Sequence, residues 1–341
     1  MTARSGRFLG AAASAAALIV VQLAAAQPLE LRLSVETPPS HARNLAAERW
    51  ADAIDRLSDG TVTVRVFPSG QLYGSAGAIK ALASGALDLS VQANSTLSSF
   101  EPNLSVVALP MFFGATREQV RDILDGPLGR ELYERLESKG VLVPGRHFEY
   151  APNNTAYTTR KPVRSYEDLR GLKLATPPSP LFVVMLRSMG AFPVATPRSE
   201  TVIQLSQGQV DGLGSMTDLT ISGGKLWDAG IRYAFRDIAG WGFYMPLVSR
   251  ATWSRLTESQ RDAIRRGWME AEAWAREYTE AELERGVAAN LEHGVVSYSP
   301  PPDEQQRMRA RLIGEQAALV EQGRMDADFV ARVQARLAEL Q

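Results

Sequence analysis

The sequence contains no cysteine and only three histidines among its 341 residues. The absence of cysteine excludes disulfide bonds, thiolate nucleophiles and cysteine-ligated metal sites. His41, His147 and His293 lack the close spacing of metal-binding motifs, so we expect structural or exposed roles for them. No metal site is therefore predicted.

Neither sign of charge dominates the chain. The formal net charge is −1, and the Lys and Arg residues are scattered along the sequence. Nucleic-acid binding requires a basic surface, so no nucleic-acid partner is expected. After residue 26, no apolar run reaches the length needed to cross a bilayer, which predicts a soluble mature chain.

Residues 1–26 have the composition of a secretory signal peptide. Arg4 and Arg7 form a positive beginning, an Ala-rich apolar stretch covers 9–23, and three alanines end at Ala26. This order predicts export, with cleavage after about Ala26. The alternative is an N-terminal membrane anchor, because the apolar stretch approaches spanning length.

Catalytic and cofactor motifs are also missing. The sequence has no Gly-x-Ser-x-Gly elbow and no Walker loop, and Gly212-Leu213-Gly214-Ser215 lacks the third glycine of a dinucleotide-binding fingerprint. We therefore predict no catalytic residues, no cofactor and no enzyme. An exported hydrolase stays an alternative, because catalytic groups converge in space rather than in sequence.

The apolar pattern predicts an α/β protein. A strand over 29–35, a helix over 40–57 and a strand over 62–66 form a βαβ unit, which favours a parallel sheet. Asn94 follows a buried strand, at the sheet edge where such folds bind ligands; a local turn role is the alternative. We expect a single helix over 118–138.

A second βαβ series begins near residue 151 and contains the segment most suggestive of ligand contact. Between 171 and 215 the pattern is strand, loop, helix, helix and strand, with Ser179 as a helix N-cap and Pro180 at the first helical position. We expect a further short helix over 224–229. Helix N-termini expose N–H groups, so a ligand is expected near Ser179.

The C-terminal part contains one unusually long helical pattern. Thr257 and Gln260 form a capping box, and helical spacing continues to Leu291. A helix of about 35 residues would be about 50 Å long. Because this exceeds the width of one small domain, we expect the helix to extend along two.

Several phrases of the sequence together resemble the periplasmic solute-binding proteins of TRAP (tripartite ATP-independent periplasmic) transporters, the dicarboxylate-binding-type family. The likeness covers essentially the whole mature chain. The phrases are VFPSGQLYG at 66–74, ASGALDL at 83–89, RKPV at 160–163, DLRGLK at 168–173, MGAFPV at 189–194, Ser199-Glu200, and QGQVDG at 207–212.

The resemblance implies a two-domain α/β periplasmic binding protein with mixed sheets, hinge strands and one long helix that spans both domains. Domain I is expected at 27–152 plus 241–280, and domain II at 153–240 plus 281–341, with the ligand cleft between them. The implied function is a periplasmic receptor that binds a small organic acid. It would deliver this acid to the small and large TRAP membrane subunits, which use an ion gradient. The alternatives are an ABC-type or sensor-coupled periplasmic binding protein.

The polar anchors typical of that family are replaced in this chain. The position of the arginine that clamps the ligand's carboxylate corresponds to Ala175, and a second common arginine corresponds to Asn154 or Thr155. Gly214-Ser215-Met216 replaces an acidic-Asn-Pro triplet, which places Ser215 at the expected pocket. The usual bidentate clamp is thus absent, because none of these side chains carries a positive charge.

Two substitutes for the clamp are visible in the sequence. Arg198 stands where relatives usually carry an apolar or aromatic pocket residue, and the Ser179 helix start suits an anion. Phe182, Trp241 and Tyr244 are candidates for contact with an apolar or aromatic ligand body. The alternatives are a solvated helix-start role for Arg198 and plain core packing for the aromatic residues.

Overall fold

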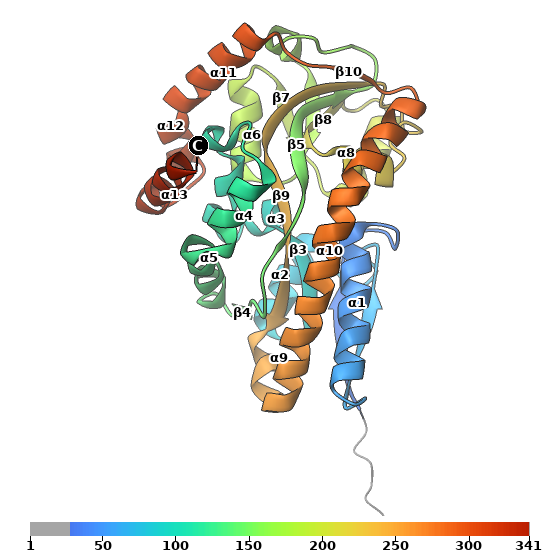
Figure 1. The fold of residues 1–341 in the computed structure, drawn as a ribbon. Helices are drawn as coiled ribbons and strands as arrows, with labels where there is room; N and C mark the ends of the chain where they lie inside the picture. Colours follow the sequence, from blue (N-terminus) through green and yellow to red (C-terminus); the bar gives the residue numbers. More distant parts are fainter. Residues whose placement is uncertain (1–27, 341) are drawn as a thin grey trace, which may run out of the picture.

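A computed structural model describes residues 28–340, so the predicted signal peptide at 1–26 lies outside the described residues. The chain forms two lobes, one above the other, which are connected by long strands and a long helix (Figure 1). Within the described part, no helix is both long and apolar enough to span a membrane.

The first lobe contains the βαβ units predicted from the start of the chain. Strand β1 lies between β2 and β3 and is parallel to both. Leu31 and Leu33 of β1 are completely buried beneath the helices, as the alternating pattern predicts. The elements are β1 (Leu29–Ser34), α1 (Ala42–Leu57), β2 (Val62–Phe67), α2 (Ser75–Ser84), β3 (Leu89–Ala93), α3 (Asn94–Leu97) and α9 (Arg250–Arg255).

The second lobe repeats this parallel arrangement. Strand β6 lies between β7 and β8 and is parallel to both. Pro180 occupies the first turn of α6, as predicted. The elements are β6 (Lys173–Thr176), α6 (Pro180–Ser188), β7 (Phe192–Ala195), α7 (Arg198–Ser206), β8 (Gly212–Met216) and α8 (Asp218–Gly223).

Two long strands join the lobes into one mixed sheet. Strand β9 (Tyr233–Ser249) pairs with β3 of the first lobe and with β5 (Phe148–Thr158), which in turn pairs with β8 of the second lobe. The pairing of β5 with β9 is irregular at three places between Glu149 and Ala156. Such irregularities bend strands, and these two strands are the predicted connections between the lobes.

Helix α10 (Glu258–Glu292) confirms the predicted long helix, including its Thr257–Gln260 capping box. It packs on α1 of the first lobe, where Gly267 lies against Ile54, and on α8 of the second, where Gly286 lies against Ser222. The side chain of Trp50 fixes the first contact by donating a hydrogen bond to the carbonyl oxygen of Ile264 at 2.9 Å. The single helix α10 thus contacts both lobes (Figure 1).

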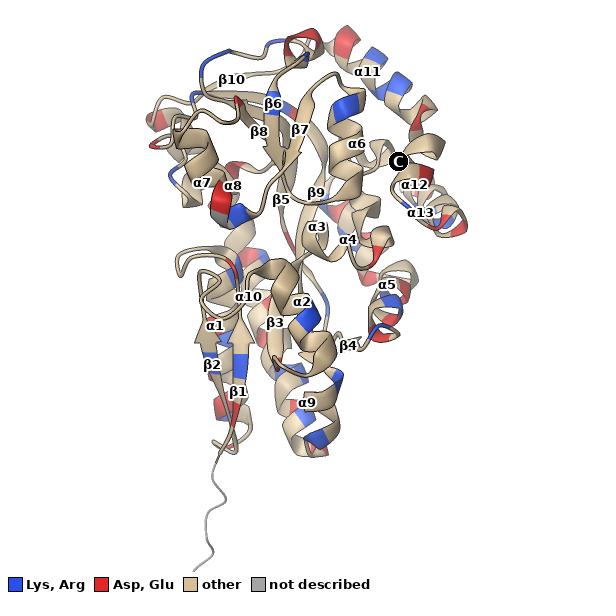
Figure 2. Ribbon diagram, turned by 180° about the vertical axis from the view of Figure 1, so that it is seen from behind, with Lys and Arg blue, Asp and Glu red and all other residues tan. Residues whose placement is uncertain are grey.

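The remaining elements are mostly helices, and the short strands β4 and β10 extend the sheet by pairing with β9. Gly126 and Pro127 divide the single helix expected over 118–138 into α4 and α5. Acidic and basic residues are interspersed over both lobes (Figure 2). The elements are η1 (Pro102–Ala108), η2 (Pro110–Phe112), α4 (Arg117–Asp125), α5 (Pro127–Glu137), β4 (Val141–Leu142), η3 (Tyr166–Leu169), β10 (Val296–Tyr298), α11 (Pro302–Gly314), α12 (Gln316–Gln322) and α13 (Ala327–Glu339).

Candidate functional site

A cavity of about 300 Å³ lies between the two lobes. Its walls include the segments at the carboxyl ends of five strands, namely β1 and β3 of the first lobe and β6, β7 and β8 of the second. Open α/β sheets bind ligands at this edge, because the loops there are free to carry polar groups. The N-terminal turn of α2 and the middle of β9 complete the wall.

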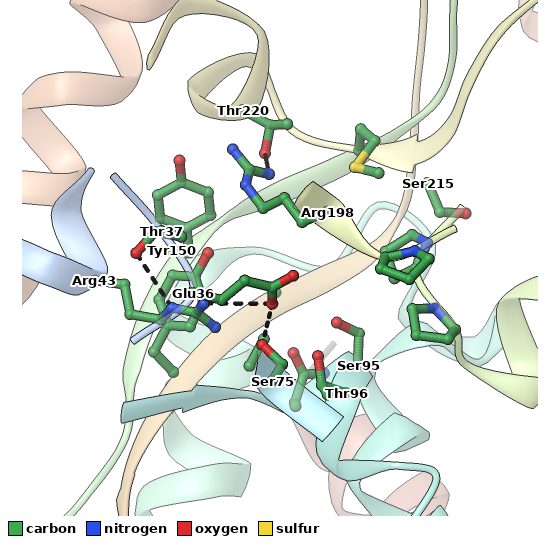
Figure 3. Close-up of a pocket in the computed structure, with 18 of the residues that line it drawn as sticks. Glu36, Thr37, Arg43, Ser75, Ser95, Thr96, Tyr150, Arg198, Ser215 and Thr220 are labelled. Atoms are coloured by element: carbon green, nitrogen blue, oxygen red, sulfur yellow. Dashed lines mark hydrogen bonds and ion pairs between the residues drawn. The ribbon is translucent and has the colours of Figure 1, made fainter. Parts of the chain in front are cut away.

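Three charged residues line the cavity: Glu36, Arg43 and Arg198. Arg43 and Glu36 come from the first lobe and Arg198 from the second, and Figure 3 shows them on opposing walls. The cavity therefore carries one more positive than negative charge. An excess of positive charge in an enclosed site favours an anionic ligand.

Arg43 is an almost completely buried guanidinium, with 2% of its surface exposed. Its Nε donates to Oγ1 of Thr37 at 3.4 Å, and its Nη2 lies 3.7 Å from Oε2 of Glu36. Among the described residues, Nη2 has no hydrogen-bond acceptor. Burial lowers the pKa of Arg43, and the charge of Arg198 lowers it further. This cation is held in place but not fully satisfied.

Arg198 begins helix α7 and is partly buried at the cavity wall. Its Nη1 donates weakly to Oγ1 of Thr220, at 3.4 Å. Within residues 28–340, no carboxylate oxygen is recorded within 4.0 Å of its guanidinium. Arg198 is thus a cation without an anionic partner in the part of the chain that the structure describes.

An aromatic cluster forms part of the cavity wall, where Tyr150 and Tyr244 line the cavity. His41 stacks on Tyr150 with 4.9 Å between ring centres, and its edge faces Tyr244 at 5.8 Å. His41 also caps α1, because its Nδ1 accepts a hydrogen bond from the backbone N–H of Arg43. Burial lowers the pKa of His41 well below its usual value, and the charges of Arg198 and Arg43 lower it further.

Ser215 combines backbone strain with an unpaired hydroxyl. It has φ of 54°, a left-handed conformation that is uncommon for residues other than glycine. The residue is 2% exposed, and its Oγ has no hydrogen-bond partner among the described residues. Strained residues with unsatisfied polar groups concentrate at functional sites, and this one lies on the cavity wall.

Of the residues proposed from the sequence as ligand contacts, five line the cavity: Arg198, Ser215, Asn94, Phe182 and Tyr244. Asn94 also has a structural role, which connects distant segments and so differs from the local turn role that was its alternative. It accepts a hydrogen bond from the backbone N–H of Phe243 and donates one to the carbonyl oxygen of Leu104.

Ser179 and Trp241 do not line the cavity. The Ser179 hydroxyl is completely buried and lies within hydrogen-bond distance of the hydroxyls of Ser98 and Ser105. Trp241 turns into the core, where its Nε1 donates to the carbonyl oxygen of Ala115. Both side chains therefore help to support the wall from behind.

Asn154, Thr155 and Ala175 also lie outside the cavity lining. Asn154 donates to Tyr157 and Asp218 in the second lobe, and Thr155 donates to the backbone carbonyl of Asp237. Ala175 is completely buried within an apolar cluster of the second lobe. The neighbour that reaches the cavity from this part of β5 is Asn153.

Several lining residues were not proposed from the sequence. One of them, Arg43, could have been identified from the helical pattern of the sequence. It shares the helical spacing of the apolar residues Ala46, Ala47, Trp50 and Ile54, so the predicted helix places a charge on its buried face. Buried charges are costly and often functional. The polar and aromatic residues missed were Glu36, Thr37, Arg43, Ser75, Ser95, Thr96, Tyr150, Asn153, Thr196, Thr217 and Thr220.

Residues 28–340 contain no cluster of three or more His, Asp or Glu side chains arranged to hold a metal ion.

Comparison with known proteins places the chain in a family. Residues 33–319 match the model of the bacterial extracellular solute-binding proteins, family 7. A solute-binding protein of Roseobacter denitrificans is 27% identical over 277 residues, covering 81% of each chain. The C4-dicarboxylate-binding periplasmic protein of Rhodobacter capsulatus is 24% identical over 297 residues, covering 86% of each chain.

Solved structures share the fold at low sequence identity. The sugar acid binding protein of Advenella mimigardefordensis, solved with galactonate, is similar with a TM-score of 0.85 and 20% identity, over 92% of this chain and 99% of that one. A TRAP periplasmic solute-binding protein of Sulfurospirillum deleyianum, solved with succinate, has a TM-score of 0.81 and 21% identity, over 90% and 98%. The family match covers most of the chain, so this protein belongs to the bacterial extracellular solute-binding proteins of family 7.

Proposed function

We propose that this protein is a periplasmic receptor that binds a small organic acid between its lobes and delivers it to the small and large subunits of a TRAP transporter. The observation that carries the proposal is Arg198, a cation on the cavity wall without an anionic partner among the described residues. Family 7 consists of solute-binding proteins rather than enzymes. Its relatives include the 2,3-diketo-L-gulonate-binding periplasmic protein of Escherichia coli, 27% identical over 183 residues.

Arg198 takes the role of carboxylate clamp in this proposal. A guanidinium presents a planar fork of donors that matches the two oxygens of a carboxylate. The position that the family resemblance assigns to the clamping arginine is occupied by Ala175 in this chain, and Ala175 is buried in the core. The charge needed for an acid is therefore supplied from α7 rather than from β6.

Further donors surround the same space. The Ser215 hydroxyl is buried on the wall without an internal partner among the described residues. Residues 74–77, which include the first turn of α2, also face the cavity. The first N–H groups of a helix lack internal acceptors, so they add hydrogen bonds and a partial positive charge for the ligand's oxygens.

The rest of the wall suits the carbon skeleton of a small solute. Phe182, Tyr150 and Tyr244 contribute aromatic surface, and Pro177 and Pro197 contribute apolar surface from the second lobe. A cavity of about 300 Å³ is at the small end of ligand pockets. We propose a compact acid with an apolar or aromatic face.

Ligand binding would also bring the lobes together. Arg43 and Ser75 belong to the first lobe, while Arg198 and Ser215 belong to the second. A ligand that touches both walls binds the closed arrangement better than an open one and shifts the population toward closure. The membrane subunits would then recognise the closed form.

The binding step is tested with the mature protein and a panel of acids that includes galactonate and succinate. We expect at least one acid to raise the melting temperature in a concentration-dependent way. Calorimetry with that acid should show a loss of affinity of about 30-fold or more for Arg198→Ala.

Arg187→Ala is the matched control, because Arg187 is exposed on α6 and outside the cavity. It makes the same change in net charge and should leave affinity unchanged. Equal affinity of the Arg198→Ala protein and the unaltered protein would rule out Arg198 as the clamp.

A further inference from the structure

Glu36 is the only negatively charged residue among those that line the cavity within residues 28–340. It follows β1, and its side chain is 9% exposed. Its Oε2 accepts a hydrogen bond from the Ser75 hydroxyl and faces Nη2 of Arg43. A carboxylate in a site for acids is unexpected, because like charges repel strongly where water is excluded.

The contact with Arg43 does not fully occupy this carboxylate. The Arg43–Glu36 distance of 3.7 Å is longer than a hydrogen bond, and Nη2 of Arg43 has no acceptor among the described residues. Oε1 of Glu36 has no recorded hydrogen-bond partner in the described chain. Figure 3 shows it turned away from Arg43 and Ser75. One acceptor is therefore left free at the cavity wall.

The charges on the cavity wall determine which net charge of a ligand fits the site. Arg43 and Glu36 compensate each other, so Arg198 is the one remaining uncompensated charge among the described lining residues. A ligand with a single carboxylate neutralises Arg198. A ligand with a second carboxylate would leave the site negative and bring that group toward Glu36, which costs binding energy.

We propose that Glu36 is a specificity-determining residue that selects singly charged acids carrying a hydrogen-bond donor, and rejects dicarboxylates. The inference rests on the proposed function, since it assumes that an acid occupies this cavity. The donor, a hydroxyl or amide N–H of the ligand, binds Oε1 of Glu36, while the carboxylate binds Arg198. Specificity here comes from repulsion of the wrong ligand as much as from attraction of the right one.

Two pairs of probes isolate the second charge. Succinamate carries an amide where succinate carries its second carboxylate. Galactonate carries a hydroxymethyl group where galactarate carries its second carboxylate. With the unaltered protein, we expect the singly charged member of at least one pair to bind about tenfold more tightly or better. This comparison needs no variant, so a folding defect cannot obscure it.

The Glu36→Gln variant assigns the preference to this residue. Gln keeps the shape and an acceptor oxygen but removes the charge, so the preference should fall by about tenfold or reverse in favour of the dicarboxylate. Glu30→Gln, an exposed position on β1, is the control for the same charge change and should keep the preference.

Two outcomes would overturn this inference and leave the proposed function standing. In the first, dicarboxylates bind the unaltered protein with the same affinity as their singly charged counterparts. In the second, Glu36→Gln weakens the binding of both members of a pair equally. The second outcome would leave Glu36 with a structural role only. If no acid in a broad panel binds the unaltered protein, the proposed function fails, and the inference fails with it.

Discussion

The side-chain oxygen of Asn94 accepts a hydrogen bond from the backbone N–H of Phe243 at 3.1 Å, which joins the end of β3 to the middle of β9. The Nδ2 of Asn94 donates to the carbonyl oxygen of Leu104 at 3.2 Å. Asn94 is 2% exposed, so neither partner has ready access to water. One side chain thus fixes three segments beneath the cavity.

Replacing Asn94 by Ala should lower the free energy of unfolding by about 2 kcal/mol, because a buried N–H and a buried carbonyl lose their partner. Chemical denaturation measures this change. Ser95→Ala is the matched control, since the neighbouring hydroxyl also faces the cavity but has no recorded bond in the described chain. Equal stability of the two variants would contradict the role assigned to Asn94.

Ser215→Gly should stabilise the protein while weakening ligand binding. Glycine adopts a φ of 54° without steric cost, and the change also removes a buried hydroxyl without a recorded partner. We expect the free energy of unfolding to rise by about 1 kcal/mol. Calorimetry with an acid that binds the unaltered protein should show lower affinity. A variant that is less stable than the unaltered protein would refute the assignment of strain.

The stability of the protein should fall as the pH decreases below about 6.5, partly because of His41. Burial, and then the charges of Arg198 and Arg43, lower the pKa of His41 in the folded state. Below the unfolded-state pKa of 6.5, the unfolded chain binds a proton that the folded chain does not. The loss between pH 8 and pH 5.5 should be about 1 kcal/mol for this group.

His41→Asn isolates that contribution, because Asn keeps an acceptor for the helix N-cap but does not titrate. Urea denaturation of both proteins at several pH values from 5 to 8 gives the comparison. The variant should have the smaller slope of stability against pH. Parallel curves for the two proteins would show that His41 does not contribute.

Gly286→Val should disturb the contact between α10 and α8. A Cβ at this position would lie 2.8 Å from Oγ of Ser222 and 3.0 Å from Cδ2 of Leu219, so the helices must separate. We expect a loss of about 2 kcal/mol in thermal or chemical unfolding. Ala288→Val, at an exposed position on the same helix, should cost about 0.5 kcal/mol. Similar losses for both would indicate no close packing at Gly286.

Much of the fold could be predicted from the sequence because its signals are local. Alternating apolar residues predicted β1 and β2, and the Thr257–Gln260 capping box predicted the start of α10. The prediction of a helix over 224–229 was wrong, because the helix α8 begins six residues earlier, at Asp218. Its N-cap is Thr217, whose hydroxyl accepts a hydrogen bond from the backbone N–H of Thr220. A run of Thr and Ser residues gave little apolar periodicity there.

The site was less predictable, because it depends on which strand ends meet in space. Residues directly after strands, such as Asn94 and Ser215, could be proposed from sequence order. In β5, irregular pairing around Asn154 breaks simple alternation, so counting residues does not identify Asn153 as the one that lines the cavity. Glu36 and Arg43 offered no spacing to connect them with Arg198, which lies on the opposing wall.

The path of β9 has a consequence for how such receptors can diversify by recombination. Its 17 residues pair with β3 and β4 near one end and with β10 near the other, so one uninterrupted segment belongs to both lobes. A crossover between two homologous genes anywhere in this region would exchange pieces of both lobes at once. A single crossover within this segment therefore cannot exchange one lobe alone.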